Sequence, residues 1–167
     1  NNIWYAPAFA RIIETSASFC QMIESMRIEK FVTFSSHSMS FRTLVDIDYW
    51  PVDMISDDSV VYWKAFLHFN GAYRVVPLYT TVSMDAAYSS SFFKTLWVQY
   101  KQKRRWAWGI ENFPYVMMGF RYNDRIPLAT KVRRAFHILE SHYTWAVWAI
   151  IITFIAPLPL APLAFFP

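Results

Sequence analysis

The sequence predicts a mixed α/β domain that leads into an interfacial helix and a membrane segment. Four stretches place apolar residues at mostly helical spacing: 7–26, 56–70, 91–110 and 127–142. Two short stretches have the composition or the alternation of β-strands: 31–34 and 73–78. A run without charged residues then extends from Trp145 to Phe166. Helix and strand patterns in one chain, followed by such a run, favour an α/β domain at a membrane.

Length and composition indicate one domain with extensive apolar contacts. The chain has 167 residues, enough for a single sizeable core. Aromatic residues make up 20% and charged residues only 17%, which membrane contact or a substrate channel would explain. Cys20 is the single cysteine, so an internal disulfide framework and a cysteine-rich zinc site are excluded. Because the chain begins with Asn1 and carries no polar tail, we expect an internal piece of a longer protein.

The N-terminal part predicts a helix, a short strand and a loop. Charged residues such as Arg11 and Glu14 separate the apolar positions of 7–26, so this helix is amphipathic and does not span a membrane. Residues 31–34 are β-rich. The serine-rich residues 35–38 that follow have turn chemistry and predict a loop.

The middle of the chain predicts a capped helix and an edge strand. Ser56, Asp57 and Asp58 carry side-chain oxygens that accept hydrogen bonds from the free amides at a helix start. We therefore expect a helix from there to Asn70-Gly71, which supplies the turn. Residues 73–78 alternate like a strand, and their proline places the strand end at an edge or exit.

The C-terminal third predicts three further segments. The helix at 91–110 should end where Asn112-Phe113-Pro114 interrupts it. The helix at 127–142 is basic and amphipathic, and it could lie among lipid headgroups. The uncharged run 145–166 would give about 33 Å of helix against a hydrocarbon core of about 30 Å, which favours a membrane span. Its three prolines leave a re-entrant or interfacial segment as the alternative.

Positive charge is concentrated in one part of the chain. The net charge is only +4. Between residues 94 and 134, however, lysines and arginines are frequent and only Glu111 and Asp124 oppose them. Such a block predicts phosphate-bearing partners, either a nucleotide sugar or anionic lipid headgroups.

Two groups of residues carry the candidate chemistry. The neighbouring carboxylates Asp57 and Asp58 are candidates for a general base; the alternative is that they only cap a helix. Gln102, Arg105 and Trp106 lie within about one helical turn and can converge on one site. Arginine binds phosphate through its planar fork. The alternative is a basic helix whose tryptophan anchors at a membrane interface.

The order of these groups resembles a known enzyme family. An acidic pair precedes the run Gln102-Lys103-Arg104-Arg105-Trp106, and a membrane segment follows it. This order resembles the membrane-bound family 2 glycosyltransferases related to cellulose, chitin and hyaluronan synthases. The text around Val76-Pro77-Leu78-Tyr79 and from Gln99 to Gly109 looks like a bacterial membrane branch of that family. The resemblance covers roughly Asn1 to Phe166.

The resemblance implies an inverting transfer of a sugar from a nucleotide sugar, UDP-linked, to a saccharide or lipid-linked acceptor. It implies Asp58 as the general base with Asp57 beside it. It implies that Gln102 and Arg105 serve the diphosphate and that Trp106 offers its ring to the acceptor sugar. Further candidates for substrate binding are Ser36 and His37, in a loop that resembles the family's acceptor-side segment but lacks its usual glycine.

The resemblance also implies a GT-A type fold and a divalent metal. It makes residues 1–126 the acceptor half of the catalytic domain, 127–143 an interfacial amphipathic helix, and 144–167 the start of a transmembrane region. Mg²⁺ or Mn²⁺ is expected at an Asp-x-Asp motif upstream, and no metal ligand is assigned in this chain. Asp46-Ile47-Asp48 is rejected as that motif because it follows the acceptor loop. The chain alone is therefore expected to be inactive.

The expected location is a multi-pass membrane protein with its catalytic side in the cytoplasm. Arg133 and Arg134 beside the apolar run support that orientation. Expected partners are the nucleotide sugar, the acceptor and membrane lipid, without nucleic acid. The rival hypothesis is a non-catalytic membrane-associated module that binds anionic lipid or nucleic acid.

Overall fold

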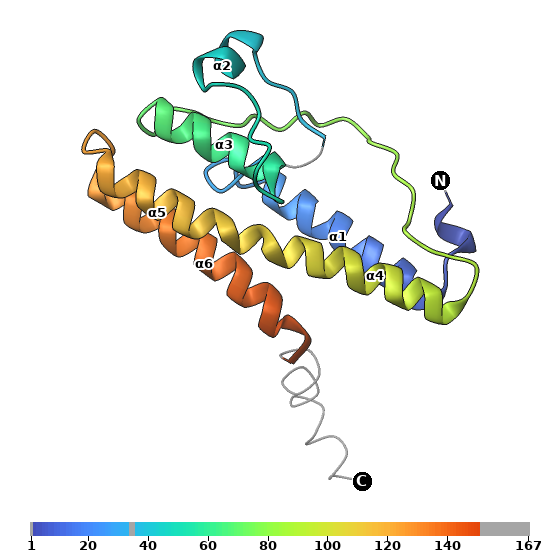
Figure 1. Ribbon diagram of the computed structural model, residues 1–167. Coiled ribbons are helices and arrows are strands. Elements are labelled where there is room, and N and C mark those ends of the chain that lie inside the picture. The colour runs from blue at the N-terminus through green and yellow to red at the C-terminus, as the bar shows by residue number, and fades with distance from the viewer. Residues whose placement is uncertain (1, 34–35, 151–167) are drawn as a thin grey trace.

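The computed structural model describes residues 2–33 and 36–150, and this part of the chain is helical (Figure 1). Its elements are the 3-10 turn η1 (Ile3–Tyr5), α1 (Ala8–Ser25), α2 (Phe41–Asp46), α3 (Asp57–His68), α4 (Phe92–Ala107), the 3-10 turn η2 (Trp108–Glu111), α5 (Asn112–Tyr122) and α6 (Leu128–Ile150). Figure 1 shows α4, η2 and α5 following one another in nearly one line, with α6 running back beside α5.

The main core lies between α3, α5 and α6. Tyr62 and Phe66 of α3 are buried against Val116 and Phe120 of α5, and Ile138 of α6 completes the cluster. The aromatic rings pack edge to face, as quadrupolar rings prefer, with 6.4 Å between the centroids of Phe66 and Phe120. Burial of these apolar side chains is the main source of stability for the three helices.

Helix α3 ends in the turn that the sequence predicts. Asn70 and Gly71 both have positive φ angles, 53° and 86°. The Gly71 amide donates to the carbonyl of Phe66 at 2.8 Å, which satisfies one of the last helical carbonyls. The predicted turn at Asn70-Gly71 is therefore present.

A second, smaller set of contacts joins α1 to α4. The rings of Phe9 and Phe92 lie 4.9 Å apart, and Gln99 Nε2 donates to Glu14 Oε1 at 2.9 Å. Asn2 holds the segment before α4, since its side chain exchanges hydrogen bonds of 3.2 and 2.7 Å with the backbone of Ala86. These contacts hold the N-terminal residues against the start of α4.

The predicted α/β fold is wrong, because the described residues form helices and no strand. Residues 31–33 and 73–78 lack regular secondary structure. A strand is stable only when its backbone pairs with another strand, and neither segment has such a partner here. Their β-rich composition serves packing instead, since Val32, Tyr73 and Val75 contact the core of α3, α5 and α6. The chain therefore lacks the sheet of the expected GT-A domain in its described part.

The sequence predicts an interruption at Asn112-Phe113-Pro114, but in the structure these residues begin helix α5. Pro114 is the third residue of α5, where the backbone amide would have no helical partner in any case. Proline is tolerated in this first turn because its missing donor is not needed there. The chain therefore resumes a helix directly after η2.

The predicted membrane segment falls on α6 and beyond it. Helix α6 begins at Leu128, and its charged residues include Lys131, Arg133 and Glu140. No helix among residues 2–33 and 36–150 is both long and apolar enough to cross a membrane. The expectation of an α/β domain followed by a membrane span is corrected accordingly. Residues 151–167, which make up most of the predicted span, lie outside the described residues.

Replacement of Phe66 by alanine should destabilise the fold strongly. Phe66 is 1% exposed, and its ring contacts both α5 and the guanidinium of Arg134. We expect Phe66→Ala to lower the free energy of unfolding by about 3–5 kcal/mol, measured by urea denaturation followed by circular dichroism. Phe93→Ala is the matched control, because Phe93 is 79% exposed. Equal losses in the two variants would contradict the core assigned to α3, α5 and α6.

Candidate functional site

The acidic start of α3 is attached to the junction between η2 and α5. Ser56 precedes α3, and both its amide and its hydroxyl donate to Glu111 Oε1 at 2.8 Å. Asn112, which is buried, donates from Nδ2 to the hydroxyl of Ser59 at 2.7 Å. A helix start has unpaired amides and a partial positive charge, so a carboxylate there is stabilising. Glu111 thus fixes the start of α3 against the segment that follows the Gln102–Trp106 run.

An aromatic pair lies beside Asp57. The indole Nε1 of Trp50 donates to Asp57 Oδ2 at 2.9 Å. The ring of His37 stacks on that indole, with 5.2 Å between centroids and 15° between planes. Two aromatic side chains, of which Trp50 contacts Asp57 directly, are therefore ordered beside one carboxylate.

Asp58 is half-buried next to this group. Its backbone carbonyl accepts a hydrogen bond from the hydroxyl of Thr33, which is buried. Its carboxylate makes no hydrogen bond or ion pair within the part of the chain that the structure describes. A carboxylate in that position retains its lone pairs for an incoming hydroxyl.

The basic run lies near the end of α4 and has two different faces. Gln102 is half-buried, and its Oε1 is buried without a hydrogen-bond partner among the described residues. Arg105 is exposed, and Trp106 is 42% exposed. The amine of Lys103 lies 3.6 Å from the centre of the Trp106 ring, a close cation–π contact.

Burial lowers the pKa of Lys103. The negative charge of Glu14 on α1 opposes this effect, and so does the Cys20 thiol. Desolvation disfavours the ammonium form, which the indole face and Glu14 then stabilise. The Lys103 ammonium therefore packs on one face of the Trp106 ring.

The structure brings some of the predicted site residues together and leaves others apart. Asp57, Asp58 and His37 lie around one helix start. Ser36 is exposed and shares no hydrogen bond with them among the described residues. The run from Gln102 to Trp106 shares no hydrogen bond with the acidic pair among the described residues. It is joined to the pair through the backbone to Glu111 and then through Ser56.

Trp50, Glu111 and Asn112 were not predicted from the sequence. From the sequence, Glu111 stands out only as a charge that opposes the basic block, and no pattern marks Trp50. The Asn112 segment was taken as a helix interruption. Tertiary contacts 7 and 55 residues apart in sequence give these residues their roles, and no local pattern encodes such pairs.

The described residues do not fit a resident divalent metal. No three of their histidine, cysteine, aspartate or glutamate side chains gather closely enough to hold a metal ion. Asp57 is bonded to an indole instead of a second carboxylate. The proposed reaction steps therefore use only side chains of the described residues.

The arrangement suits a ligand that carries several hydroxyl groups. Asp57 and Asp58 supply acceptor oxygens, and the imidazole of His37 adds a nitrogen. The face of an aromatic ring offers apolar surface, while its neighbouring polar groups bind hydroxyls. A sugar ring has both kinds of surface.

Glu111→Ala should weaken the start of α3 while leaving its core packing in place. Two hydrogen bonds to Ser56 would be lost, and we expect the free energy of unfolding to fall by about 1–3 kcal/mol. The amide of Ser56 should exchange its hydrogen faster, as measured by NMR. Glu111→Gln retains an acceptor oxygen and should show a smaller loss. An unchanged exchange rate in Glu111→Ala would refute the link between η2 and α3.

Comparison with known proteins identifies no relative. No protein-family model matches the chain, and neither does any curated protein or any solved structure. Its function is therefore inferred from the side chains and contacts of the site itself.

Proposed function

We propose that the start of α3 forms the acceptor side of an inverting glycosyl transfer. The donor is a nucleotide sugar, UDP-linked, and the acceptor is a saccharide or a lipid-linked sugar at the cytoplasmic face of a membrane. The observation that carries the proposal is the hydrogen bond from Trp50 Nε1 to Asp57, directly beside the half-buried Asp58. It joins a carboxylate pair to an aromatic surface, as an acceptor-sugar site requires.

Asp58 is the general base in this proposal. Its carboxylate takes the proton from the acceptor hydroxyl as the hydroxyl oxygen attacks the anomeric carbon of the donor. The bond between that carbon and the diphosphate oxygen breaks, and the nucleoside diphosphate leaves with the bonding electron pair. Attack from the face opposite the leaving group inverts the anomeric configuration. Positioning of the two reactants and removal of the proton both lower the barrier.

Asp57 and the aromatic pair orient the acceptor. Because Trp50 donates to Asp57 Oδ2, one oxygen of that carboxylate is held and the other can accept from a sugar hydroxyl. His37, stacked on Trp50, adds a second polar group at the edge of the same surface. Ser36 lies in the same loop and is exposed to ligand.

The basic run serves the departing diphosphate. Arg105 is exposed, and its guanidinium can bind two phosphate oxygens at once. Gln102 contributes a buried amide oxygen that lacks a partner among the described residues, so an incoming donor group would satisfy it. Trp106 remains available as a second surface for a sugar ring.

Asp58→Asn should abolish transfer in the natural polypeptide that carries this chain. Membranes containing that polypeptide would be supplied with a panel of nucleotide sugars, and nucleotide release would be measured. Loss of the base should slow release from the active donor by about 10²–10⁴-fold. Asp46→Asn is the matched control, because Asp46 is an exposed carboxylate that the proposal does not use. Full activity of Asp58→Asn at equal expression would refute the assignment of the base.

One observation favours a second function, a non-catalytic module that binds anionic lipid or nucleic acid. Trp97 and Tyr100 of α4 stack at 5.3 Å, and Lys101 lies 5.5 Å from the Trp97 ring. Both aromatic side chains are more than half exposed, at 56% and 51%, so cations and rings alternate on an open surface. Such surfaces bind lipid headgroups or stacked bases.

Arg105→Lys should separate these two functions. Lysine retains the charge but loses the planar fork that binds two phosphate oxygens. The transferase should therefore lose nucleotide release, whereas a charge-dependent binding module should bind vesicles or RNA almost as before. Release that persists in Arg105→Lys would refute the role of its planar fork, whereas no release with any donor, together with binding unchanged in Arg105→Lys, would favour the module.

A further inference from the structure

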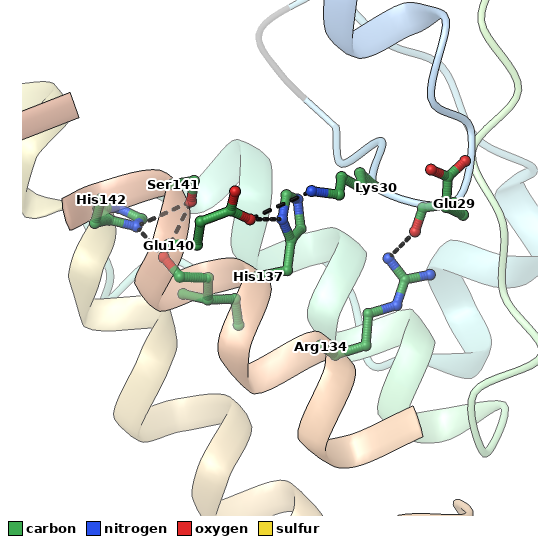
Figure 2. A network of polar contacts seen from close by, with 8 residues as sticks. Glu29, Lys30, Arg134, His137, Glu140, Ser141 and His142 are labelled. Atoms are coloured by element: carbon green, nitrogen blue, oxygen red, sulfur yellow. Dashed lines mark hydrogen bonds and ion pairs between the residues drawn. The ribbon is translucent and has the colours of Figure 1, made fainter. Parts of the chain in front are cut away.

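A small cavity lies between the turn after α1 and the middle of α6. Its volume is about 210 Å³, and its lining includes the side chains of Lys30, Arg133, Arg134 and His137. Figure 2 shows these elements facing each other, with Lys30 and Glu29 on one side and α6 on the other. The site lies outside the group around Asp57 and Asp58, and the proposed transfer does not use it.

Arg134 is the most buried of the cations in this cavity. Its side chain is 9% exposed, and one terminal nitrogen donates to the backbone carbonyl of Glu29. The guanidinium lies 5.1 Å from the ring of Phe66, and its Nε is buried without a hydrogen-bond partner among the described residues. A buried guanidinium with an unsatisfied donor is costly unless an anion or water compensates it.

The carboxylate of Glu140 interacts with two of the other basic side chains in the cavity. Glu140 Oε2 lies 3.3 Å from the amine of Lys30 and 3.4 Å from Nδ1 of His137 (Figure 2). These hydrogen bonds lower the pKa of Glu140. Burial lowers the pKa of His137, the charges of Lys30 and Arg134 act in the same direction, and Glu140 opposes them. Apart from His137, the cavity lining thus has one more basic residue than acidic residues.

Arg133 adds a further cation at the edge. It is exposed and makes no hydrogen bond or ion pair within residues 2–33 and 36–150. Lys30, Arg133 and Arg134 line one cavity together with the acidic residues Glu29 and Glu140, of which Glu140 forms an ion pair with Lys30. An oxyanion there would meet two guanidinium groups and an ammonium at once, which is the chemistry that binds phosphate tightly.

We propose that this cavity binds a phosphate group. Lys30 and Arg133 contact its oxygens from the open side, and Arg134 stabilises its charge from within. Glu140 competes for Lys30 and moves away when the phosphate enters. The volume leaves room for a small oxyanion with a few waters, since a water takes about 30 Å³.

An exposed apolar surface on α6 next to the cavity helps to distinguish a lipid phosphate from a free phosphate. Phe136 lines the cavity and is 66% exposed, and Val132 and Tyr143 continue an exposed apolar stripe along α6. Apolar side chains beside a phosphate site suit a lipid, whose acyl chains would lie along the stripe while its headgroup enters the cavity. A free phosphate has the same headgroup chemistry without that stripe, so the two sources can be told apart by experiment.

The test measures binding of the full chain to two probes. Sedimentation with phosphatidylcholine vesicles, with and without phosphatidic acid, reports the lipid phosphate. The imidazole signals of His137 in NMR, assigned with His137→Gln, report titration with inorganic phosphate. We expect Arg133→Gln to weaken binding of the effective probe about tenfold, because one charged hydrogen bond is lost. Lys94→Gln removes the same charge from an exposed position on α4 and should change binding little.

Two further variants keep the proposal falsifiable. Glu140→Gln removes the competing carboxylate and should strengthen binding, the opposite of the effect of Arg133→Gln. Arg134→Lys keeps the charge of a buried position and should weaken binding, with thermal unfolding used to verify its fold. Binding to phosphatidic acid alone identifies a lipid phosphate, and a His137 shift with inorganic phosphate identifies a free one. Binding of neither probe, or equal weakening by Arg133→Gln and Lys94→Gln, would overturn the proposal.

Discussion

Burial of α3 on almost all its sides is the constraint on which the rest of the structure depends. From Val60 to Phe66 every residue is buried except the half-exposed Lys64. A helix with so little solvent contact must be covered by other elements, because its apolar side chains would otherwise remain in water. Helices α5 and α6, the loop before α2 and the segment after Gly71 provide that cover.

Because the body of α3 is covered, its polar chemistry is confined to its ends. Amides at the start of α3 need acceptors from outside the helix, and Glu111 accepts from the amide of Ser56 there. Thr33 donates to the carbonyl of Asp58 at the same end. The Asp57 side chain also accepts a hydrogen bond at this end, from the indole of Trp50. The candidate site is therefore a consequence of how the buried helix begins, and its geometry follows from the packing of α5.

Helical periodicity was the reliable part of the sequence signal. The helix expected at 7–26 is present as Ala8–Ser25, and the one expected to start at Ser56-Asp57-Asp58 begins at Asp57. The strands failed because β-rich composition indicates only that a segment fits a half-buried surface. Residues 73–78 meet that condition by packing on helices, without a paired strand. Helix α5 was missed because proline was taken as a stop, although it lies in the first turn.

The candidate site was only partly accessible from the sequence for a related reason. Carboxylates are favoured in the first turn of a helix, so the position of Asp57 and Asp58 could be predicted, whereas the predicted side-chain cap is absent at Ser56. The partners of that start come from distant segments, and only the folded chain selects Trp50 over the other seven tryptophans. The basic run illustrates the opposite case, since its spacing predicted a shared helix face, whereas the structure turns Gln102 inward and leaves Arg105 exposed.

The two proposed sites lie at different places on the same buried helix. Ser56 and Asp57 stand at its start, whereas Arg134 contacts it at Phe66, nine residues later. At about 1.5 Å per residue this separation is roughly 13 Å along the axis, beyond the range at which substitutions usually couple. A change at Glu140 or Arg133 should therefore leave the geometry around Asp57 intact. The phosphate site and the transfer site can thus be present or absent independently, although both depend on the burial of α3.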